Sequence, residues 1–433
     1  MALLVAARNA FGYVAFSPAI RASSCEEQHR AQEASGVIVL GRHRPLAGDA
    51  WNELAVRAAI EEIATDAIAH FDPDTFWPAH PSDDGVEDGS PSLYWGAAGV
   101  IWALDYLHRI GAVSVTKDFR PVLPKLLERT IATFESLSPT DYAKHGSLLF
   151  GDMGAALVAM RLAPTSILAD LVHRRAEANT GLPIRELMWG LPGSMLAAIH
   201  MAEMTDEPRW RGLFEAQGAR LFADLEETPQ GLLWTQDLYG TKDRWLGPVH
   251  GFAGNVIPLL QGWDWLTPAQ QAQVGEFVPK TLAANAWRSE IGTNWAARSK
   301  RARPPLYCQH CHGAPGMVTT FGDAPFASPE FDELLVDAGR FIWATGPLTK
   351  GSGLCHGTGG NGYAFLKLYR RTNDPIWLDR ARQFAMTAIV QYRGAQVAVG
   401  RGRYSLWTGD DGLAIYLWDC ITGEPRFPTI DVF

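Results

Sequence analysis

Hydrophobic and polar residues follow a repeating pattern along this chain. Seven apolar segments each open with the pattern G-x-x-G, and they recur at irregular intervals of roughly 40 to 60 residues. Self-similarity of this kind indicates a repeat architecture rather than a set of unrelated domains. The seven glycine pairs are Gly96/Gly99, Gly151/Gly154, Gly190/Gly193, Gly251/Gly254, Gly313/Gly316, Gly357/Gly360 and Gly409/Gly412.

Amphipathic segments lie between the apolar ones, with apolar residues at helical spacing and charged residues on the opposite side. Several of them begin with a capping residue followed by proline, as at Thr267, Ser328 and Asp374, which is typical of a helix start. The amphipathic segments are residues 51–71, 120–137, 164–181, 208–227, 267–287, 328–346 and 374–392. We therefore expect seven amphipathic helices alternating with seven apolar ones.

This alternation predicts an all-α fold, an α/α toroid (barrel) of seven inner and seven outer helices. Apolar helices, buried on both faces, form the inner ring, and amphipathic helices form the outer ring. Strand signals are weak, and we expect no more than a small hairpin in the loops. The seven glycine-rich turns are expected at one end of the barrel, where a site would lie.

Residues 41–433 are predicted to form a single domain, preceded by a poorly ordered N-terminal extension, residues 1–40. The extension has no basic region before its first apolar run, and Arg8 interrupts that run, so we do not interpret it as a signal peptide. No segment approaches the ~20 uninterrupted apolar residues of a membrane span.

Composition narrows the function classes. The net charge of −9 argues against a nucleic-acid partner, because phosphate binding needs a basic surface. The five cysteines are few and odd in number, which favours a reducing compartment, and hence the cytoplasm, over a disulfide scaffold.

The tripeptide Cys-His-Gly occurs twice, in "CHGAPG" and "CHGTGG", at the openings of neighbouring inner helices. Two thiolates and an imidazole suit Zn²⁺, and three protein ligands leave a fourth position open, as in catalytic sites. We predict Cys311, Cys355 and His356 as the ligands. Three alternatives remain open: Cys308 as a fourth ligand of a closed structural site, His312 in place of His356, and no metal at all.

Two further groups of residues are candidates for chemistry. His250 directly precedes Gly251, in register with the two Cys-His-Gly histidines, and imidazole can act as an acid or base near neutral pH. A basic segment precedes the first zinc cysteine and is either a substrate-binding surface or a solvated loop; it contains Arg298, Lys300, Arg301 and Arg303.

The repeats, together with "HGFAG", "CHGAPG" and "LCHGTGGNGYAFL", resemble the lanthionine synthetase C-like (LanC-like) family, in its stand-alone branch, over roughly residues 40 to 430. The resemblance implies an α/α barrel with zinc held by Cys311, Cys355 and His356. It also implies an acid/base role for His250. The family's cyclases carry an acidic residue four positions before the third repeat's first glycine, where this chain has Glu186.

The chain departs from the family pattern at three positions. The cyclases have an arginine four residues before the first zinc cysteine, where this chain has Tyr307. The seventh repeat carries Asp410 and Asp411 where small or apolar residues are usual. These differences bear on the substrate more than on the zinc.

The resemblance implies zinc-dependent addition of a thiol to dehydroalanine or dehydrobutyrine residues of a peptide or protein, which forms a thioether. The thiol would be glutathione or a peptide cysteine. Two alternatives remain: a non-catalytic protein that binds zinc with glutathione or a peptide, and a lanthipeptide cyclase that acts with a separate dehydratase. A sugar-processing α/α barrel would leave the Cys-His repeats unexplained.

Overall fold

The computed structural model describes residues 36–39, 41–83, 89–137, 146–238, 241–299, 304 and 306–433. Of the predicted N-terminal extension, only residues 36–39 are described, and Ile38 is buried there. The prediction of poor order for residues 1–35 and 40 lies outside the described residues.

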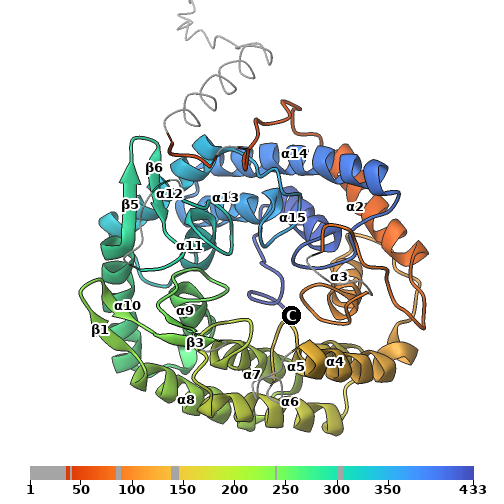
Figure 1. Cartoon of the computed structure of the whole chain (residues 1–433), viewed down its shortest axis with the longest axis horizontal. Coiled ribbons are helices and arrows are strands. Elements are labelled where there is room, and N and C mark those ends of the chain that lie inside the picture. Colours follow the sequence, from red (N-terminus) through yellow and green to blue (C-terminus); the bar gives the residue numbers. More distant parts are fainter. Residues whose placement is uncertain are drawn as a thin grey trace, which may run out of the picture.

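Two concentric rings of helices make up the described chain (Figure 1). The outer ring contains α2 (Glu53–Ala69), α4 (Leu123–Leu137), α6 (Ser166–Ala178), α8 (Pro208–Ala223), α10 (Pro268–Asn285), α12 (Pro329–Thr345) and α14 (Pro375–Val399). The inner ring contains α3 (Ala97–Arg109), α5 (Asp152–Leu162), α7 (Leu191–Thr205), α9 (Phe252–Gln261), α11 (Ala314–Phe321), α13 (Thr358–Thr372) and α15 (Asp410–Thr422). Short 3₁₀ turns lie at Arg120–Val122, Asn179–Gly181 and Trp263–Trp265. The predicted toroid of seven inner and seven outer helices is confirmed.

The predicted capping residues explain where the outer helices begin. Thr267 caps α10 in a reciprocal capping box with Gln270, and the side chains of Ser328 and Asp374 accept backbone N–H groups of α12 and α14. Each capping residue is followed by proline, whose missing N–H costs no hydrogen bond in the first turn of a helix.

The glycine pairs shape the start of every inner helix. The first glycine of each pair is the residue before the helix, and the second lies against the carbonyl oxygen of the residue six positions earlier. A Cβ on Gly360, for example, would lie 1.6 Å from the Leu354 oxygen. The chain therefore folds back tightly onto the helix start, and the residue before the first glycine occupies the same end of all seven inner helices.

Three two-stranded antiparallel hairpins lie in the connections α8–α9 and α10–α11, where the sequence predicted no more than one. They are β1 (Glu226–Thr228) with β2 (Gly231–Leu233), β3 (Gln236–Leu238) with β4 (Thr241–Asp243), and β5 (Ala286–Ser289) with β6 (Gly292–Trp295). The third hairpin supports the first Cys-His-Gly turn. Asn294 of β6 donates to the Tyr307 carbonyl (3.0 Å) and accepts from the Ala314 N–H (2.7 Å).

The last residues of the chain enter the lumen of the barrel, and Figure 1 shows the C-terminus near the centre of the inner ring. Phe433 is 3% exposed. Asp431 pairs with the buried Lys367 of α13 (2.5 Å). The Phe427 ring stacks on His310, with centroids 4.5 Å apart, so this tail packs beneath the turn that carries the first Cys-His-Gly motif.

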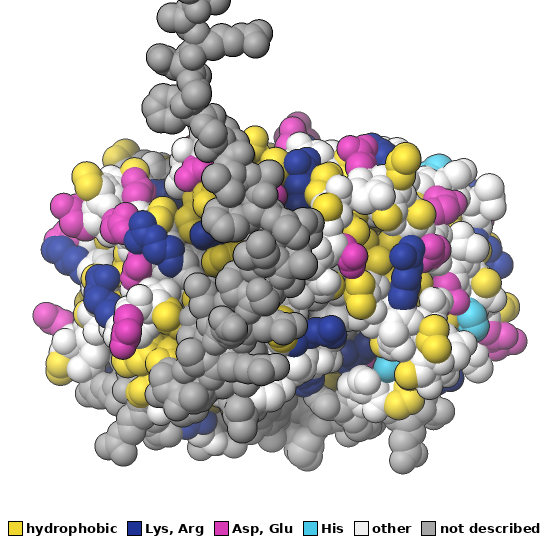
Figure 2. Space-filling view, turned by 90° about the horizontal axis from the view of Figure 1, so that it is seen from above, with side chains coloured by type: hydrophobic (Ala, Val, Ile, Leu, Met, Phe, Trp, Pro, Cys, Tyr) yellow, Lys and Arg dark blue, Asp and Glu magenta, His cyan; other side chains and the backbone are white. Residues whose placement is uncertain are grey.

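Residues distant in sequence close the ring. The Tyr404 hydroxyl donates to Asp66 of α2 (2.9 Å), and Arg393 of α14 pairs with Glu62 of α2 (2.9 Å). On the face shown in Figure 2, acidic and basic side chains are interspersed over the outer helices, as expected for their solvent-exposed side.

Candidate active site

Two neighbouring turns bring three metal-binding side chains together. Cys311 lies just before α11, and Cys355 and His356 lie just before α13. Their ligand atoms are all within 4.8 Å of one another. The Cys311 N–H donates to the Cys355 carbonyl (3.1 Å), which ties the two turns together. Among the described residues, these three form the group of His, Cys and acidic side chains with metal-site spacing.

The chemistry of this group fits a metal ion. The Cys355 thiol donates to the Cys311 sulfur, which lowers the pKa of Cys311 well below its ordinary value and raises that of Cys355 well above it. Two buried thiolates in contact therefore need a shared cation to be charged together. Nε2 of His356 is buried and has no hydrogen-bond partner among the described residues. Two sulfurs and an unpaired imidazole nitrogen are donors that borderline-soft divalent metals prefer.

Gln309 and Tyr94, which were not among the predicted site residues, also contact the two cysteine sulfurs. Gln309 donates its amide N–H to the Cys311 sulfur (2.9 Å). The Tyr94 hydroxyl hydrogen-bonds the Cys355 sulfur. Tyr94 lies two residues before Gly96 in the first repeat, so the register of the repeats was a signal that could have placed it at this end of the barrel.

The alternative ligands lie elsewhere. The Cys308 sulfur accepts from the Thr345 hydroxyl (3.4 Å), and burial raises the pKa of its thiol to about 12. His312 stacks on Trp245, with ring centroids 5.6 Å apart. Neither belongs to the group formed by Cys311 and its two neighbours.

His250 and Glu186 form a hydrogen-bonded pair at the same end of the barrel. Nδ1 of His250 lies 3.0 Å from Oε2 of the fully buried Glu186, and the His250 side chain is 29% exposed. Burial lowers the pKa of His250, but the hydrogen bond and negative charge of Glu186 outweigh burial, and the pKa is raised. Glu186 also accepts from the Met188 N–H (3.2 Å), which fixes its position. The His250 ring is 6.2 Å from that of His312.

The residues before the first glycines make a ring around the barrel mouth that contains a histidine arc and an aromatic arc, with Thr408 of the seventh repeat between them. His250, His312 and His356 belong to three consecutive repeats. The aromatic arc comes from the first three repeats. Phe150 lies 4.7 Å from Trp95 and 4.8 Å from Trp189 between ring centroids. The mouth therefore places an apolar wall opposite its ionisable groups.

The remaining predicted residues divide between described and undescribed parts of the chain. Arg298 lies with its Cζ 4.1 Å from the centre of the Trp245 ring and pairs with Asp243 (2.9 Å). Lys300, Arg301 and Arg303 lie outside the described residues, so their part in substrate binding stays a prediction.

The two seventh-repeat aspartates lie in the first turn of α15. Both are buried, and burial raises the pKa of Asp410 to about 7 and that of Asp411 well above its ordinary value. Asp410 accepts the N–H of Arg403 (2.6 Å), so its carboxyl group has a structural role in the turn before α15.

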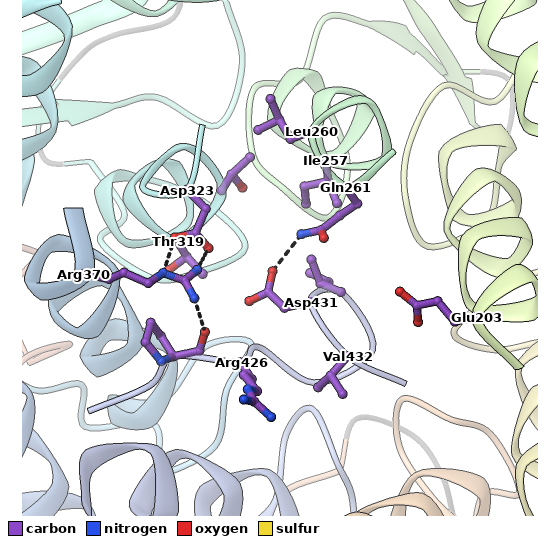
Figure 3. Close-up of a pocket in the computed structure, with 13 residues that line it drawn as sticks. Glu203, Ile257, Leu260, Gln261, Thr319, Asp323, Arg370, Arg426, Asp431 and Val432 are labelled. Carbon is purple, nitrogen blue, oxygen red and sulfur yellow. Dashed lines mark hydrogen bonds and ion pairs between the residues drawn. The ribbon is translucent and has the colours of Figure 1, made fainter. Parts of the chain in front are cut away.

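A cavity of about 460 Å³ lies at the opposite end of the barrel (Figure 3). Its lining comes from the last turns of inner helices and from the tail, and includes Glu203, Gln261, Asp323, Arg370 and Asp431. Its charged side chains have partners in the cavity wall or next to it: Arg370 pairs with Asp323, and Asp431 pairs with Lys367. This cavity is therefore separate from the Cys/His group.

The family model described as "Lanthionine synthetase C-like protein" matches residues 87–432. This chain belongs to the lanthionine synthetase C-like family. The match covers all seven glycine pairs and both Cys-His-Gly turns. It begins after α2 and does not include the N-terminal segment around residue 42.

Relatives of this LanC-like chain come from animals and plants. It is 30% identical to the zebrafish (Danio rerio) protein "Glutathione S-transferase LANCL1" over 210 residues, which is 48% of this chain and 49% of that protein. It is 44% identical to "LanC-like protein GCL1" of Arabidopsis thaliana over 166 residues, which is 38% of this chain and 35% of that protein. The chain thus spans half or less of the length of these relatives.

A solved structure, nisin cyclase, has the same fold. It aligns with a TM-score of 0.54 and 16% identity, and the alignment covers 76% of this chain and 88% of that one. Among the described residues of this LanC-like chain, no helix combines the length and the apolar content needed to cross a bilayer.

Proposed function

We propose that this protein is a zinc-dependent enzyme that adds a thiol, with glutathione as the first candidate, to dehydroalanine or dehydrobutyrine residues of a peptide or protein. The observation that carries the proposal is the presence of two chemically distinct groups at one barrel mouth. Cys311, Cys355 and His356 would hold the metal, and the His250–Glu186 pair can move a proton. When bound, zinc stabilises a thiolate at neutral pH.

The reaction needs a proton to be moved as well as a nucleophile. Addition of R–S–H across the Cα=Cβ bond forms one C–S bond at Cβ and one C–H bond at Cα, with no other reactant. Because Nδ1 of His250 is held by Glu186, Nε2 is the nitrogen available to accept the thiol proton or to deliver a proton to Cα. Glu186 keeps the ring oriented and stabilises its charged form.

Two further observations support the choice of substrate. The zebrafish relative is named a glutathione S-transferase, and we take glutathione as the candidate thiol of this chain on that likeness. Arg298 lies over the Trp245 ring and pairs with Asp243 through one nitrogen, and its other N–H groups would be donors for a glutathione carboxylate. The four described cysteines are all free, in keeping with a proposed location in the cytoplasm.

The first test is the zinc content of the purified protein beside three alanine variants. We expect stoichiometric zinc in the wild type, its loss in Cys311→Ala and Cys355→Ala, and its retention in Cys308→Ala, which serves as the matched control. Loss of zinc in Cys308→Ala as well would indicate a closed site and contradict an open coordination position.

The second test is catalysis itself. The wild type, with glutathione and a dehydroalanine peptide, should give the thioether adduct by mass spectrometry, and His250→Phe should keep its zinc but lose most of the rate. General acid–base groups contribute typically 10²–10⁴-fold to rates. A zinc-loaded wild type that gives no adduct would instead favour the non-catalytic binding protein.

A further inference from the structure

A segment outside the matched family region reaches the candidate metal centre. Residues 41–44 run along the loop that precedes the second Cys-His-Gly turn. The Arg42 carbonyl accepts from the Thr349 N–H (2.9 Å), and the Arg44 N–H donates to the Pro347 carbonyl (2.9 Å). His43 adds a hydrogen bond between Nδ1 and the Gly346 carbonyl (3.1 Å). We call residues 41–44 the N-terminal strap.

The strap holds the side chain of Arg42 over the first Cys-His-Gly turn. Its guanidinium carbon lies 4.5 Å from the centre of the Tyr307 ring. One guanidinium nitrogen, Nη2, donates to Oε1 of Gln309 at 2.5 Å. The other end of the same amide, Nε2 of Gln309, donates to the Cys311 sulfur at 2.9 Å. A continuous chain of two hydrogen bonds therefore joins the strap to a metal-ligand sulfur.

The donor chemistry of arginine decides which way this amide faces. A guanidinium has five N–H donors and no acceptor, so it can pair only with the oxygen of the Gln309 amide. Its NH₂ group is then left to face the sulfur. Gln309 as a whole is only 8% exposed, and its backbone N–H and C=O both hydrogen-bond the backbone of His312 (3.1 and 3.0 Å). Without Arg42, rotation of the amide by half a turn would aim a partly negative oxygen at a thiolate.

We propose that Arg42 is a positioning residue of the metal centre, which acts through Gln309 to aim an N–H donor at the Cys311 sulfur. This inference rests on the proposed zinc site. Through Arg42, the N-terminal strap would contribute to the metal site although it lies outside the matched family region, residues 87–432. Groups that orient metal ligands typically change metal affinity by 10–100-fold when removed.

A double-mutant cycle on the full chain tests the inference. Zinc affinity is measured by competition with a chromophoric chelator for wild type, Arg42→Met, Gln309→Leu and the double variant. We expect Gln309→Leu to weaken zinc binding about 10–100-fold. Arg42→Met should also weaken it, and in the Gln309→Leu background it should cause no further loss, because its effect passes through the amide.

Matched variants separate this role from a loss of stability. Arg42→Lys keeps a donor for the Gln309 oxygen and should retain affinity within about threefold of wild type, and Arg44→Met, in the same strap, should do the same. Arg42→Ala goes through the same cycle, so the result does not depend on how methionine packs. In cobalt-loaded protein, the thiolate-to-cobalt charge-transfer band should shift equally in Arg42→Met and Gln309→Leu.

Three results would each contradict the positioning role of Arg42. Arg42→Met and Arg42→Ala could both bind zinc within twofold of wild type, the losses could multiply fully in the double variant, or Arg42→Lys could lose as much affinity as Arg42→Met. Each would overturn the relay while leaving the zinc site in place. A wild type without stoichiometric zinc would instead overturn the proposed function, so the two failures are distinguishable.

Discussion

Lys367 offers a quantitative test of how the tail is held in the barrel. Its side chain is 1% exposed and lies between Asp323 after α11 and Asp431 of the tail. Lys367→Met keeps most of the side-chain volume but removes the charge, so Asp431 loses the cation with which it pairs, while Asp323 keeps only its pair with Arg370. Removing one partner of a buried ion pair typically costs about 3–5 kcal/mol.

The size of the protein converts this free energy into a small but measurable thermal shift. An unfolding entropy of about 2.1 cal/mol/K per residue gives about 0.9 kcal/mol/K for 433 residues. Lys367→Met should therefore lower the midpoint of thermal unfolding by about 3 to 6 °C. The exposed pair of Arg340 with Glu333 (2.6 Å; side chains 51% and 62% exposed) provides the control, because such surface pairs contribute about 0–1 kcal/mol.

Differential scanning calorimetry of wild type, Lys367→Met and Arg340→Met measures both shifts under one buffer condition. Adding Asp431→Asn to Lys367→Met removes one unpaired charge and should recover part of the loss. Equal midpoints for Lys367→Met and Arg340→Met would refute the reasoning, because burial would then make no difference to the strength of the pair.

Three other predictions concern the site and the repeats. Glu186→Gln should lower the pKa of His250, because the negative charge of Glu186 no longer opposes the effect of burial. The protonated ring is then lost at lower pH, so the alkaline limb of the pH–rate profile should move to lower pH, with zinc content unchanged. Gly360→Ala forces a methyl against the Leu354 carbonyl and should destabilise the fold by several kcal/mol, whereas Gly394→Ala, in open space on α14, should stabilise it by up to about 1 kcal/mol in urea unfolding. Removing zinc with a chelator should lower the thermal midpoint of the wild type but not of Cys311→Ala, since only a folded state with both cysteines binds the ion.

The repeat pattern predicted the features that arise within one repeat. Helix starts at Thr267, Ser328 and Asp374 follow from local capping chemistry, and the shared register of the residues before the glycines brought the two Cys-His-Gly turns to one end. Helical period and turn chemistry act over a few residues, so a single sequence is enough to read them.

Contacts between distant parts of the ring could not be predicted, because they leave no local pattern in the sequence. Arg42 meets Gln309 across 267 positions, and Tyr94 meets Cys355 from the first repeat to the sixth. The lumenal position of Phe433 depends on the whole ring having closed. The β5–β6 hairpin has a weak strand signal because β6 buries polar side chains in place of an apolar face. One of them, Asn294, hydrogen-bonds the neighbouring turn.

The closure of the ring between α2 and α14 has a consequence for how the chain is made. Glu62 and Arg393, which join these helices, are 331 positions apart. At about 5–20 residues per second, a ribosome needs roughly 17 to 66 s to synthesise that interval. Throughout this time the first repeat lacks the neighbour that covers it, unlike an end repeat of an open solenoid, which carries a polar cap. During that interval the ring is an open arc, and chaperones that cover apolar helix faces would act on the first repeat until the seventh is made.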